Sequence, residues 1–195
     1  MTFFALPIPT SQQSRIAEGF APFQRQWPAV QWVHPEDYHL TLRFIGGLPP
    51  DELAHLLAVV QRQRLNWTPF TMDLKGLCCF PPRRDRGVLW IGVDPIPGEL
   101  RDLQEHLEAQ VQSLGFPPER RPFTPHLTVG RFQGADAPSI MDALPAQTDR
   151  LWGRLTWDEY VLMKRRSGAR GLTSPPAYEV LARFPVESYA GASRV

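Results

Sequence analysis

The chain has few cysteines with which to support redox chemistry or a thiolate metal site. Cysteine occurs only twice among 195 residues, as the adjacent pair Cys78 and Cys79. Adjacent cysteines rarely form a disulfide bond with each other, and two thiolates alone do not complete a zinc site. We therefore expect two reduced, packed cysteines in a reducing compartment, with no bound metal and no other cofactor.

Strong charge and long hydrophobic runs are also absent. The formal net charge is only +1, which argues against non-specific binding along nucleic-acid backbones but permits recognition of a single phosphate or chain end. No apolar run approaches the roughly 20 residues of a membrane-spanning helix, and the N-terminus lacks the pattern of a signal peptide. We therefore expect a globular, cytoplasmic protein without membrane contacts.

Two short, nearly identical segments carry the main functional signal. HLTL occupies residues 39–42 and HLTV occupies residues 126–129. In a strand, residues i and i+2 point to the same face, so His39 and Thr41 project together, away from the aliphatic residues between them. His126 and Thr128 repeat this arrangement. Two imidazoles and two hydroxyls on the polar faces of two buried strands indicate a paired acid–base site.

The two motifs belong to a longer internal repeat. Pro-Ile-Pro follows a predicted strand at residues 7–9 and again at 95–97. Each half has the order β-α-β-α-β, and such a duplication commonly packs about a pseudo-two-fold axis, with the motif strands face to face across a central cleft. Helices are predicted over residues 11–26, 50–62, 98–114 and 137–144, and the closing strands over 70–74 and 155–159.

This pair of motifs suits an in-line displacement at phosphorus. Histidine has an unperturbed pKa near neutrality, so one neutral and one protonated imidazole supply a base for the attacking water and an acid for the departing oxygen. The threonine hydroxyls can donate to the non-bridging phosphate oxygens. The chemistry requires no metal.

Side chains beside the motifs are candidates for contacts with substrate. Arg131 lies five residues after His126 and is predicted to clamp the phosphate charge. For Arg43 two interpretations stay open, a substrate contact on the cleft face if the strand is regular through Phe44, or a surface salt bridge. Four aromatic residues flank the motifs, and any of them could stack on a base, although core packing is favoured for each one singly: Phe44, Tyr38, Phe123 and Phe132. Among them we take Phe44 as the candidate for a contact with substrate.

The sequence resembles the two-histidine phosphoesterase superfamily, and within it the bacterial and archaeal RNA 2′,3′-cyclic phosphodiesterases, also called 2′-5′ RNA ligases (LigT-like). The resemblance covers nearly the whole chain. It rests on FFALPIP at residues 3–9, on WV and HLTLRFIG in the region 32–46, and on FPPR and VLWIGV in the region 80–93. It continues through GFPPE and RPFTPHLTVGR in the region 115–131. The family usually has alanine where this chain has Gly130.

The resemblance implies a bilobal α+β fold in which antiparallel sheets face a central cleft with helices outside. Residues 1–195 would form one domain, with pseudo-repeats of roughly 1–80 and 88–186 and a frayed tail at 187–195. By analogy His39 donates a proton to the leaving 3′ oxygen, His126 accepts one from water, and Thr41, Thr128 and Arg131 hold the phosphate. The sequence alone does not decide which histidine is the acid.

By the same analogy the protein opens a terminal 2′,3′-cyclic phosphate to a 2′-phosphate, and some relatives also form 2′-5′ bonds. The expected partners are RNA ends or small oligoribonucleotides that bear a 2′,3′-cyclic phosphate, and the expected state is a monomer. Alternatives are a phosphodiesterase for 2′-5′ oligonucleotides or cyclic nucleotides, an RNA-end binding module without turnover, and a dinuclear-metal enzyme, which the sparse carboxylates near the motifs disfavour.

Two arginine-rich stretches interrupt the repeat, at residues 83–86 and 164–170. Both are predicted to be exposed loops, because proline or glycine lies within or beside them. Solvated hairpin tips are the favoured interpretation. Steering of an RNA tail toward the cleft is the alternative.

Overall fold

The computed structural model describes residues 1–80, 86–134, 136–166 and 176–186, and its strands join in one antiparallel sheet. The sheet confirms the prediction of an α+β fold with antiparallel strands. A short strand, β2 (Gln31–Trp32), pairs with β6. Across the sheet, the order of the other strands is β7 (Leu151–Trp157), β4 (Phe70–Phe80), β5 (Arg86–Val93), β6 (Leu127–Gln133), β3 (His39–Gly46), β1 (Thr2–Pro7), β8 (Glu159–Arg165) and β9 (Tyr178–Pro185).

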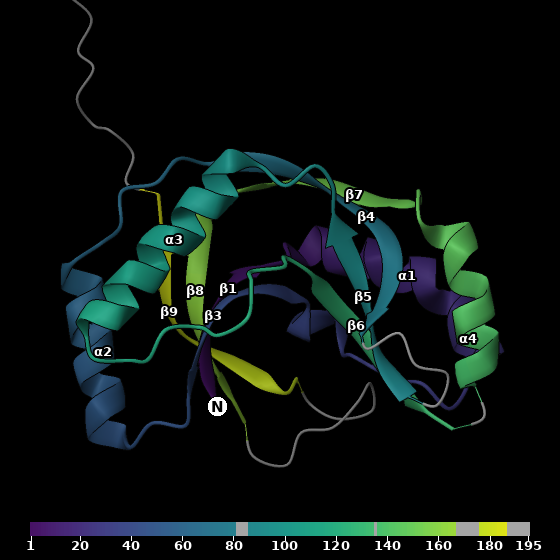
Figure 1. Ribbon diagram of the computed structural model, residues 1–195, viewed down its shortest axis with the longest axis horizontal. Coiled ribbons are helices and arrows are strands. Elements are labelled where there is room, and N and C mark those ends of the chain that lie inside the picture. The colour runs from purple at the N-terminus through teal and green to yellow at the C-terminus, as the bar shows by residue number, and fades with distance from the viewer. Residues whose placement is uncertain (81–85, 135, 167–175, 187–195) are drawn as a thin grey trace, which may run out of the picture.

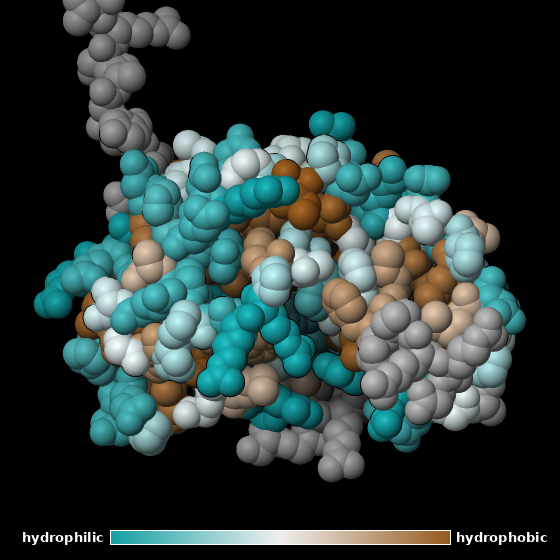
Figure 2. Space-filling view, in the orientation of Figure 1, coloured by the Kyte–Doolittle hydropathy of each residue, from teal (hydrophilic) through white to brown (hydrophobic). Residues whose placement is uncertain are grey.

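The sheet divides into two lobes at its centre, because β3 and β6 pair only through Leu40 and Leu127. Strands β3, β1, β8 and β9 form the first lobe, and strands β6, β5, β4 and β7 form the second (Figure 1). Each lobe therefore takes strands from both halves of the sequence: β4 joins the second lobe, whereas β8 and β9 complete the first. In Figure 2 the surface is hollowed near the centre, and hydrophilic side chains surround the hollow.

Four α-helices occur among the described residues, and their bounds agree closely with the predicted ranges. Helices α2 and α3 lie over the first lobe, and α1 and α4 lie beside the second (Figure 1). Helix α1 buries Ile16, Phe20 and Phe23 on one face, and the Phe20 ring stacks on Trp152 of β7 at a centroid distance of 4.2 Å. The helices are α1 (Thr10–Gln26), α2 (Pro50–Arg62), α3 (Gly98–Ser113) and α4 (Ala137–Ala143).

One predicted strand has the wrong bounds. The range 155–159 spans two strands, since β7 ends at Trp157 and β8 begins at Glu159, with Asp158 between them. The break matters because it sends β8 to the first lobe, where it pairs with β1.

Most of the two arginine-rich stretches and the tail at 187–195 lie outside the described residues. No helix in the described part of the chain is both long and apolar enough to cross a membrane.

Candidate functional site

The two histidine motifs meet at the centre of the sheet. Leu40 pairs with Leu127 in antiparallel register, and both side chains are fully buried. In an antiparallel pair the residues on either side of this contact also lie opposite each other, so His39 lies across from Thr128 and Thr41 across from His126. Each histidine is thus next to the threonine of the other motif, on one face of the sheet. The Leu40–Leu127 contact marks a local two-fold axis between the motifs.

The same backbone contact orients both imidazoles. Nδ1 of His39 lies 2.6 Å from the carbonyl oxygen of Asp37, and Nδ1 of His126 lies 2.7 Å from the carbonyl oxygen of Thr124. A carbonyl oxygen can only accept a hydrogen bond, so Nδ1 carries the proton in both rings. Nε2 is then the nitrogen that is available to exchange a proton with a substrate.

The surroundings of the two imidazoles differ although their motifs do not. His39 stacks on Phe3 at 4.9 Å and meets Tyr178 edge to face at 5.2 Å. Phe3 belongs to a buried apolar cluster with Ala5, Val161 and Met163, against which Tyr178 packs. His126 meets Phe80 and Trp90 edge to face, at 5.4 and 5.8 Å. Of the two imidazoles, only His39 therefore contacts this apolar cluster.

Burial lowers the pKa of His39 to about 4. The hydrogen bond to the Asp37 carbonyl oxygen opposes this effect, and the charge of nearby His126 adds to it. In the unliganded protein His39 is therefore neutral at pH 7. The proton-donor role that the family resemblance implies for His39 requires a nearby anion, such as a phosphate diester, to raise this pKa when substrate binds.

The lowered pKa of His39 predicts a loss of stability in acid. Unfolding restores the ordinary pKa of 6.5, so between pH 6.5 and about 4 the unfolded chain binds a proton that the folded chain does not. Wild type should therefore lose about 2 kcal/mol more than a His39→Gln variant between pH 7.5 and pH 4.5. Urea unfolding at both pH values measures the difference. Equal losses in the two proteins would contradict the lowered pKa.

An irregularity in each motif strand decides which later side chains face the site. In the pairing with β1, Thr41 lies opposite Ala5 and Arg43 opposite Phe4, so the register shifts at Leu42. In the pairing with β5, Thr128 lies opposite Trp90 and Gly130 opposite Leu89, so the register shifts at Val129. A β-bulge adds one residue and reverses the alternation of the side chains that follow it. Both motifs thus carry a bulge at the same position.

Because of these bulges, Phe44 and Arg131 share the face of the histidines. Phe44 lies opposite Phe3, and Arg131 lies opposite Val88, which is on the same face of β5 as Trp90. Arg131 is exposed and forms no ion pair with another described residue. The predicted position of Arg131 beside the phosphate needs this bulge, since five residues in a regular strand would place it on the opposite face from His126.

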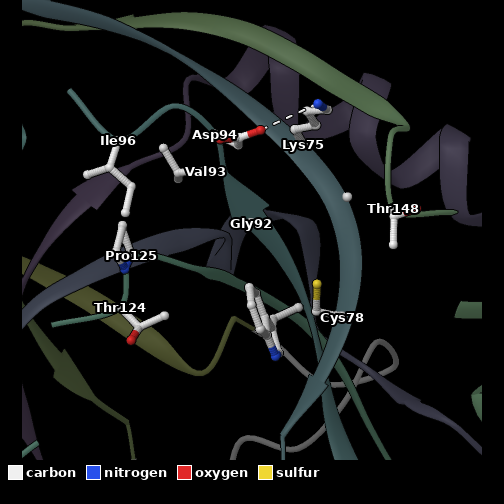
Figure 3. A pocket seen from close by; sticks show the side chains of 11 residues that line it. Lys75, Cys78, Gly92, Val93, Asp94, Ile96, Thr124, Pro125 and Thr148 are labelled. Carbon is white, nitrogen blue, oxygen red and sulfur yellow. Dashed lines mark hydrogen bonds and ion pairs between the residues drawn. The ribbon is translucent and has the colours of Figure 1, made fainter. Parts of the chain in front are cut away.

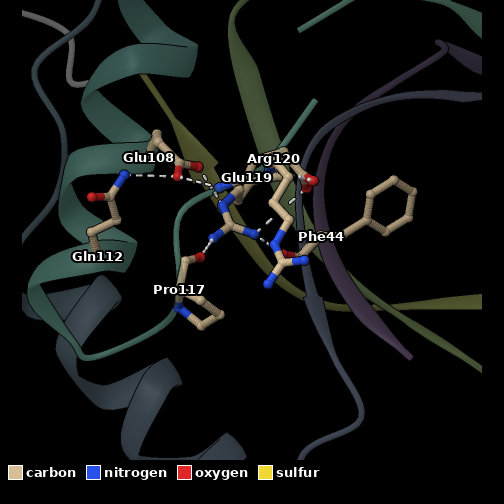
Figure 4. Close-up of polar contacts among 7 residues, drawn as sticks. Phe44, Glu108, Gln112, Pro117, Glu119 and Arg120 are labelled. Carbon is tan, nitrogen blue, oxygen red and sulfur yellow. Dashed lines mark hydrogen bonds and ion pairs between the residues drawn. The ribbon is translucent and has the colours of Figure 1, made fainter. Parts of the chain in front are cut away.

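The bulge directs Arg43 away from the face of the histidines, and the salt bridge that the sequence offered as one interpretation is present but buried. Arg43 is only 5% exposed. Its guanidinium pairs with Glu108 of α3, lies 3.8 Å from Glu119, and donates to the carbonyl oxygens of Phe44 and Pro117. Figure 4 shows the Phe44 ring directed away from this network. Arg43 thus ties β3 to α3 through a buried ion pair instead of a contact with substrate or a surface salt bridge.

Gly130 occupies the position of Arg43 in the second motif. A Cβ atom there would lie 2.8 Å from the Val30 side chain, so the chain segment before β2 packs directly against the glycine. This contact gives a physical reason for the difference from the alanine that is usual in the family. An alanine would force Val30 to move.

The aromatic rings that contact the imidazoles are not those that flank the motifs in the sequence. Of the four aromatic residues that flank the motifs, Phe44 is 46% exposed, whereas Tyr38 and Phe132 are buried and Phe123 is partly buried. The rings that touch the histidines come from other strands: Phe3, Tyr178, Phe80 and Trp90. Only Trp90 shows a local signal, because it alternates with buried residues in β5. Pairing between distant strands is not encoded in local spacing.

Asp37 links His39 to the C-terminal strand. Its carboxylate is 4% exposed and accepts hydrogen bonds from the backbone N–H groups of Ala177 and Tyr178, at 2.7 and 3.1 Å. Its own carbonyl oxygen holds Nδ1 of His39. The same residue thus positions the imidazole and the start of β9, which carries the Tyr178 ring to His39.

Within the described residues, no three His, Cys, Asp or Glu side chains are grouped to hold a metal ion.

Known proteins are similar to this chain in sequence. A family model for the 2′-5′ RNA ligase superfamily matches residues 13–169. A Geobacillus stearothermophilus protein named RNA 2′,3′-cyclic phosphodiesterase is 31% identical over 187 residues, which cover 94% of this chain and 56% of the relative. A Methanocaldococcus jannaschii protein of the same name is 28% identical over 185 residues, which cover 93% of this chain and 98% of the relative.

The fold of a solved structure agrees with these matches. A protein of Thermus thermophilus superposes with a TM-score of 0.76 at 25% identity, over 96% of this chain and 98% of that protein. This chain spans little more than half the length of the Geobacillus relative, and nearly the full length of the archaeal relative and the Thermus protein. By the family model and by these relatives, the chain belongs to the 2′-5′ RNA ligase superfamily.

Proposed function

We propose that this protein is an RNA 2′,3′-cyclic phosphodiesterase that opens a terminal 2′,3′-cyclic phosphate to a 2′-phosphate by acid–base catalysis between His39 and His126. The observation that carries the proposal is the antiparallel contact between Leu40 and Leu127, which brings the two imidazoles to one face of the sheet, each next to the threonine of the other motif. Relatives along nearly the whole chain bear this name, which supports the same activity here.

The proposed reaction moves one proton at each histidine. Water attacks phosphorus in line with O3′ and gives a proton to Nε2 of His126 as the new P–O bond forms. The bond between phosphorus and O3′ breaks, and O3′ takes a proton from Nε2 of His39. Thr41 and Thr128 donate to the non-bridging oxygens, and Arg131 offsets the charge that develops there. The reaction leaves a 2′-phosphate monoester and a free 3′-hydroxyl, with no metal.

When substrate binds, His39 takes up from solvent the proton that it lacks in the free protein. The anionic diester lies beside the imidazole and raises its pKa, so protonation of His39 is coupled to binding. Coupled groups titrate as a pair, and the rate should therefore depend on pH as a bell-shaped curve. Attack by a 5′-hydroxyl in place of water would give a 2′-5′ bond, and the name of the family supports this second activity. We further propose that the protein acts as a monomer in the cytoplasm.

The test is hydrolysis of a defined RNA end. A short oligoribonucleotide that ends in a 2′,3′-cyclic phosphate is incubated with the protein in the presence of a chelator. We expect a 2′-phosphate as the sole product, identified by its resistance to a 3′-specific phosphatase and by NMR of the phosphorus. A cyclic end that is bound but survives unchanged would instead identify a binding module without turnover. Loss of activity in chelator would exclude the metal-independent mechanism.

A further inference from the structure

The side chain of Asp37 is a buried carboxylate close to the histidine site, and the proposed reaction does not use it. Only 4% of the residue is exposed, and the carboxylate accepts the backbone N–H groups of Ala177 and Tyr178. Burying a carboxylate costs free energy, and hydrogen bonds to N–H groups offset that cost. A charged side chain at this position therefore points to one specific partner, which is the start of β9.

Backbone hydrogen bonds fix Asp37 itself. It ends a short 3₁₀ helix, η1 (Pro35–Asp37), and its N–H donates to the carbonyl oxygen of His34 at 2.8 Å. Its own carbonyl oxygen lies 2.6 Å from Nδ1 of His39. The carboxylate and the contact with the imidazole therefore belong to the same rigid residue, so the position of β9 is tied to that of His39.

The Tyr178 ring lies where the sheet alone holds the chain weakly. Tyr178 is the first residue of β9, which is at the edge of the sheet and pairs only with β8. The ends of such strands open more readily than central strands do. Tyr178 nevertheless meets His39 edge to face at 5.2 Å and Phe3 edge to face at 5.1 Å. The two hydrogen bonds to the Asp37 carboxylate supply the anchor that a neighbouring strand would otherwise provide.

Among the described residues, the second motif has no equivalent of this anchor. Thr124 stands two residues before His126, as Asp37 does before His39, and its carbonyl oxygen holds the imidazole in the same way. However, Thr124 is exposed and lines an open groove of about 260 Å³ together with Trp90 (Figure 3). Trp90 contacts His126 from β5, which has a paired strand on both sides. The carboxylate is therefore a difference between two nearly identical motifs.

We propose that Asp37 is a positioning residue for His39: its carboxylate holds the start of β9, which keeps the Tyr178 ring against the imidazole and fixes the direction of Nε2. The inference rests on the proposed function and adds a positioning residue to it. Asp37 acts through the backbone of β9 and an aromatic ring, so it moves no proton itself. Loss of the anchor should therefore weaken the proton transfer that His39 performs, and this effect should require the His39 imidazole.

The test begins with Asp37→Asn, which keeps the size of the side chain and the backbone contact with His39. The amide has one acceptor oxygen and sets an NH2 group against the second N–H, so the anchor is weakened. For hydrolysis of a 2′,3′-cyclic phosphate we expect kcat to fall by about 10- to 100-fold, because a misplacement of about 1 Å can cost that much. Glu36→Gln is the matched control, since Glu36 is the neighbouring carboxylate but is exposed. It should stay within about twofold of wild type.

The His39→Ala background separates positioning from general damage to the fold. Without the imidazole, Asp37→Asn should change kcat by less than about twofold, whereas a structural defect would slow both backgrounds equally. Tyr178→Ala removes the ring directly and should reproduce the loss seen in Asp37→Asn. It tests the same contact if Asp37→Asn does not fold, and melting temperatures verify the folding of each variant.

NMR titration of His39 in the free protein is a readout that does not need turnover. In Asp37→Asn and in Tyr178→Ala the pKa of His39 should rise from about 4 toward its ordinary value of 6.5, because water reaches the ring. Loss of the negative charge of Asp37 alone would lower this pKa, so a rise identifies the ring contact as the cause. Equal losses of kcat in both backgrounds, or an unchanged His39 titration in both variants, would overturn the inference. Failure of wild type to hydrolyse the cyclic phosphate would overturn the proposed function, and the titration would still test the positioning of His39.

Discussion

Replacing His126 with alanine is expected to lower kcat for hydrolysis of the cyclic phosphate by about 10²- to 10⁴-fold, and His39→Ala should have an effect of similar size. The reason is that in the proposed mechanism each imidazole moves one of the two protons that the displacement needs. Because both protons move in one reaction, the double variant should be little slower than either single variant. Single-turnover rates on an oligoribonucleotide with a cyclic end provide the measurement.

His106→Ala is the control for these variants, because His106 lies exposed on α3. It should leave kcat within about twofold of wild type. The pH profile separates the two catalytic roles, since each variant should lose one limb of the bell-shaped curve. Near wild-type activity in both His39→Ala and His126→Ala would refute acid–base catalysis by this pair.

Arg43→Met is expected to lower the free energy of unfolding by about 3 kcal/mol or more, which is a large part of the stability of a typical domain. The variant leaves Glu108 partly buried without its cation, and the carbonyl oxygens of Phe44 and Pro117 without a donor. Urea unfolding at pH 7 measures the change. The effect should fall on stability, because the guanidinium faces α3 and not the histidines.

Arg131→Met is the matched variant on the other motif. The Arg131 side chain is exposed, so the free energy of unfolding should change by less than about 0.5 kcal/mol. Loss of a charge-assisted contact with phosphate should instead lower kcat/KM by roughly 10- to 100-fold. The opposite pattern, with Arg43→Met affecting only kcat/KM and Arg131→Met only stability, would contradict the strand register described here.

The contrast between these arginines shows the limit of reasoning from strand periodicity. Alternation correctly predicts that His39 and Thr41 share one face, as do His126 and Thr128, because each pair lies before the bulge. After Leu42 and Val129 the alternation reverses, which exposes Phe44 and Arg131 and buries Arg43. A single extra residue in the pairing has no signature in local sequence, since it depends on the register of the neighbouring strand.

The helices and their bounds follow from the sequence because helical periodicity is local. Leu100, Leu103, Leu107 and Val111 repeat at helical spacing, and all four are buried in α3. Which strands make up each lobe does not follow from the sequence. Strand β4 lies in the first half of the sequence but joins the second lobe, and β8 lies in the second half but joins the first lobe. Each pairs with a strand that has an open edge, because this pairing satisfies its backbone hydrogen-bonding groups.

The sequence by itself therefore determined the residues to which we assign the proposed chemistry: two histidines and two threonines in a duplicated motif, and an arginine after the second copy. Only the tertiary structure decided how the two copies differ. His39 packs against Phe3 and Tyr178 of an apolar cluster that β1, β8 and β9 bring together, and burial lowers its pKa, whereas His126 contacts Phe80 of β4 and Trp90 of β5. Burial and strand register arise from residues far apart in the chain, so identical motifs acquire different properties only when the sheet forms.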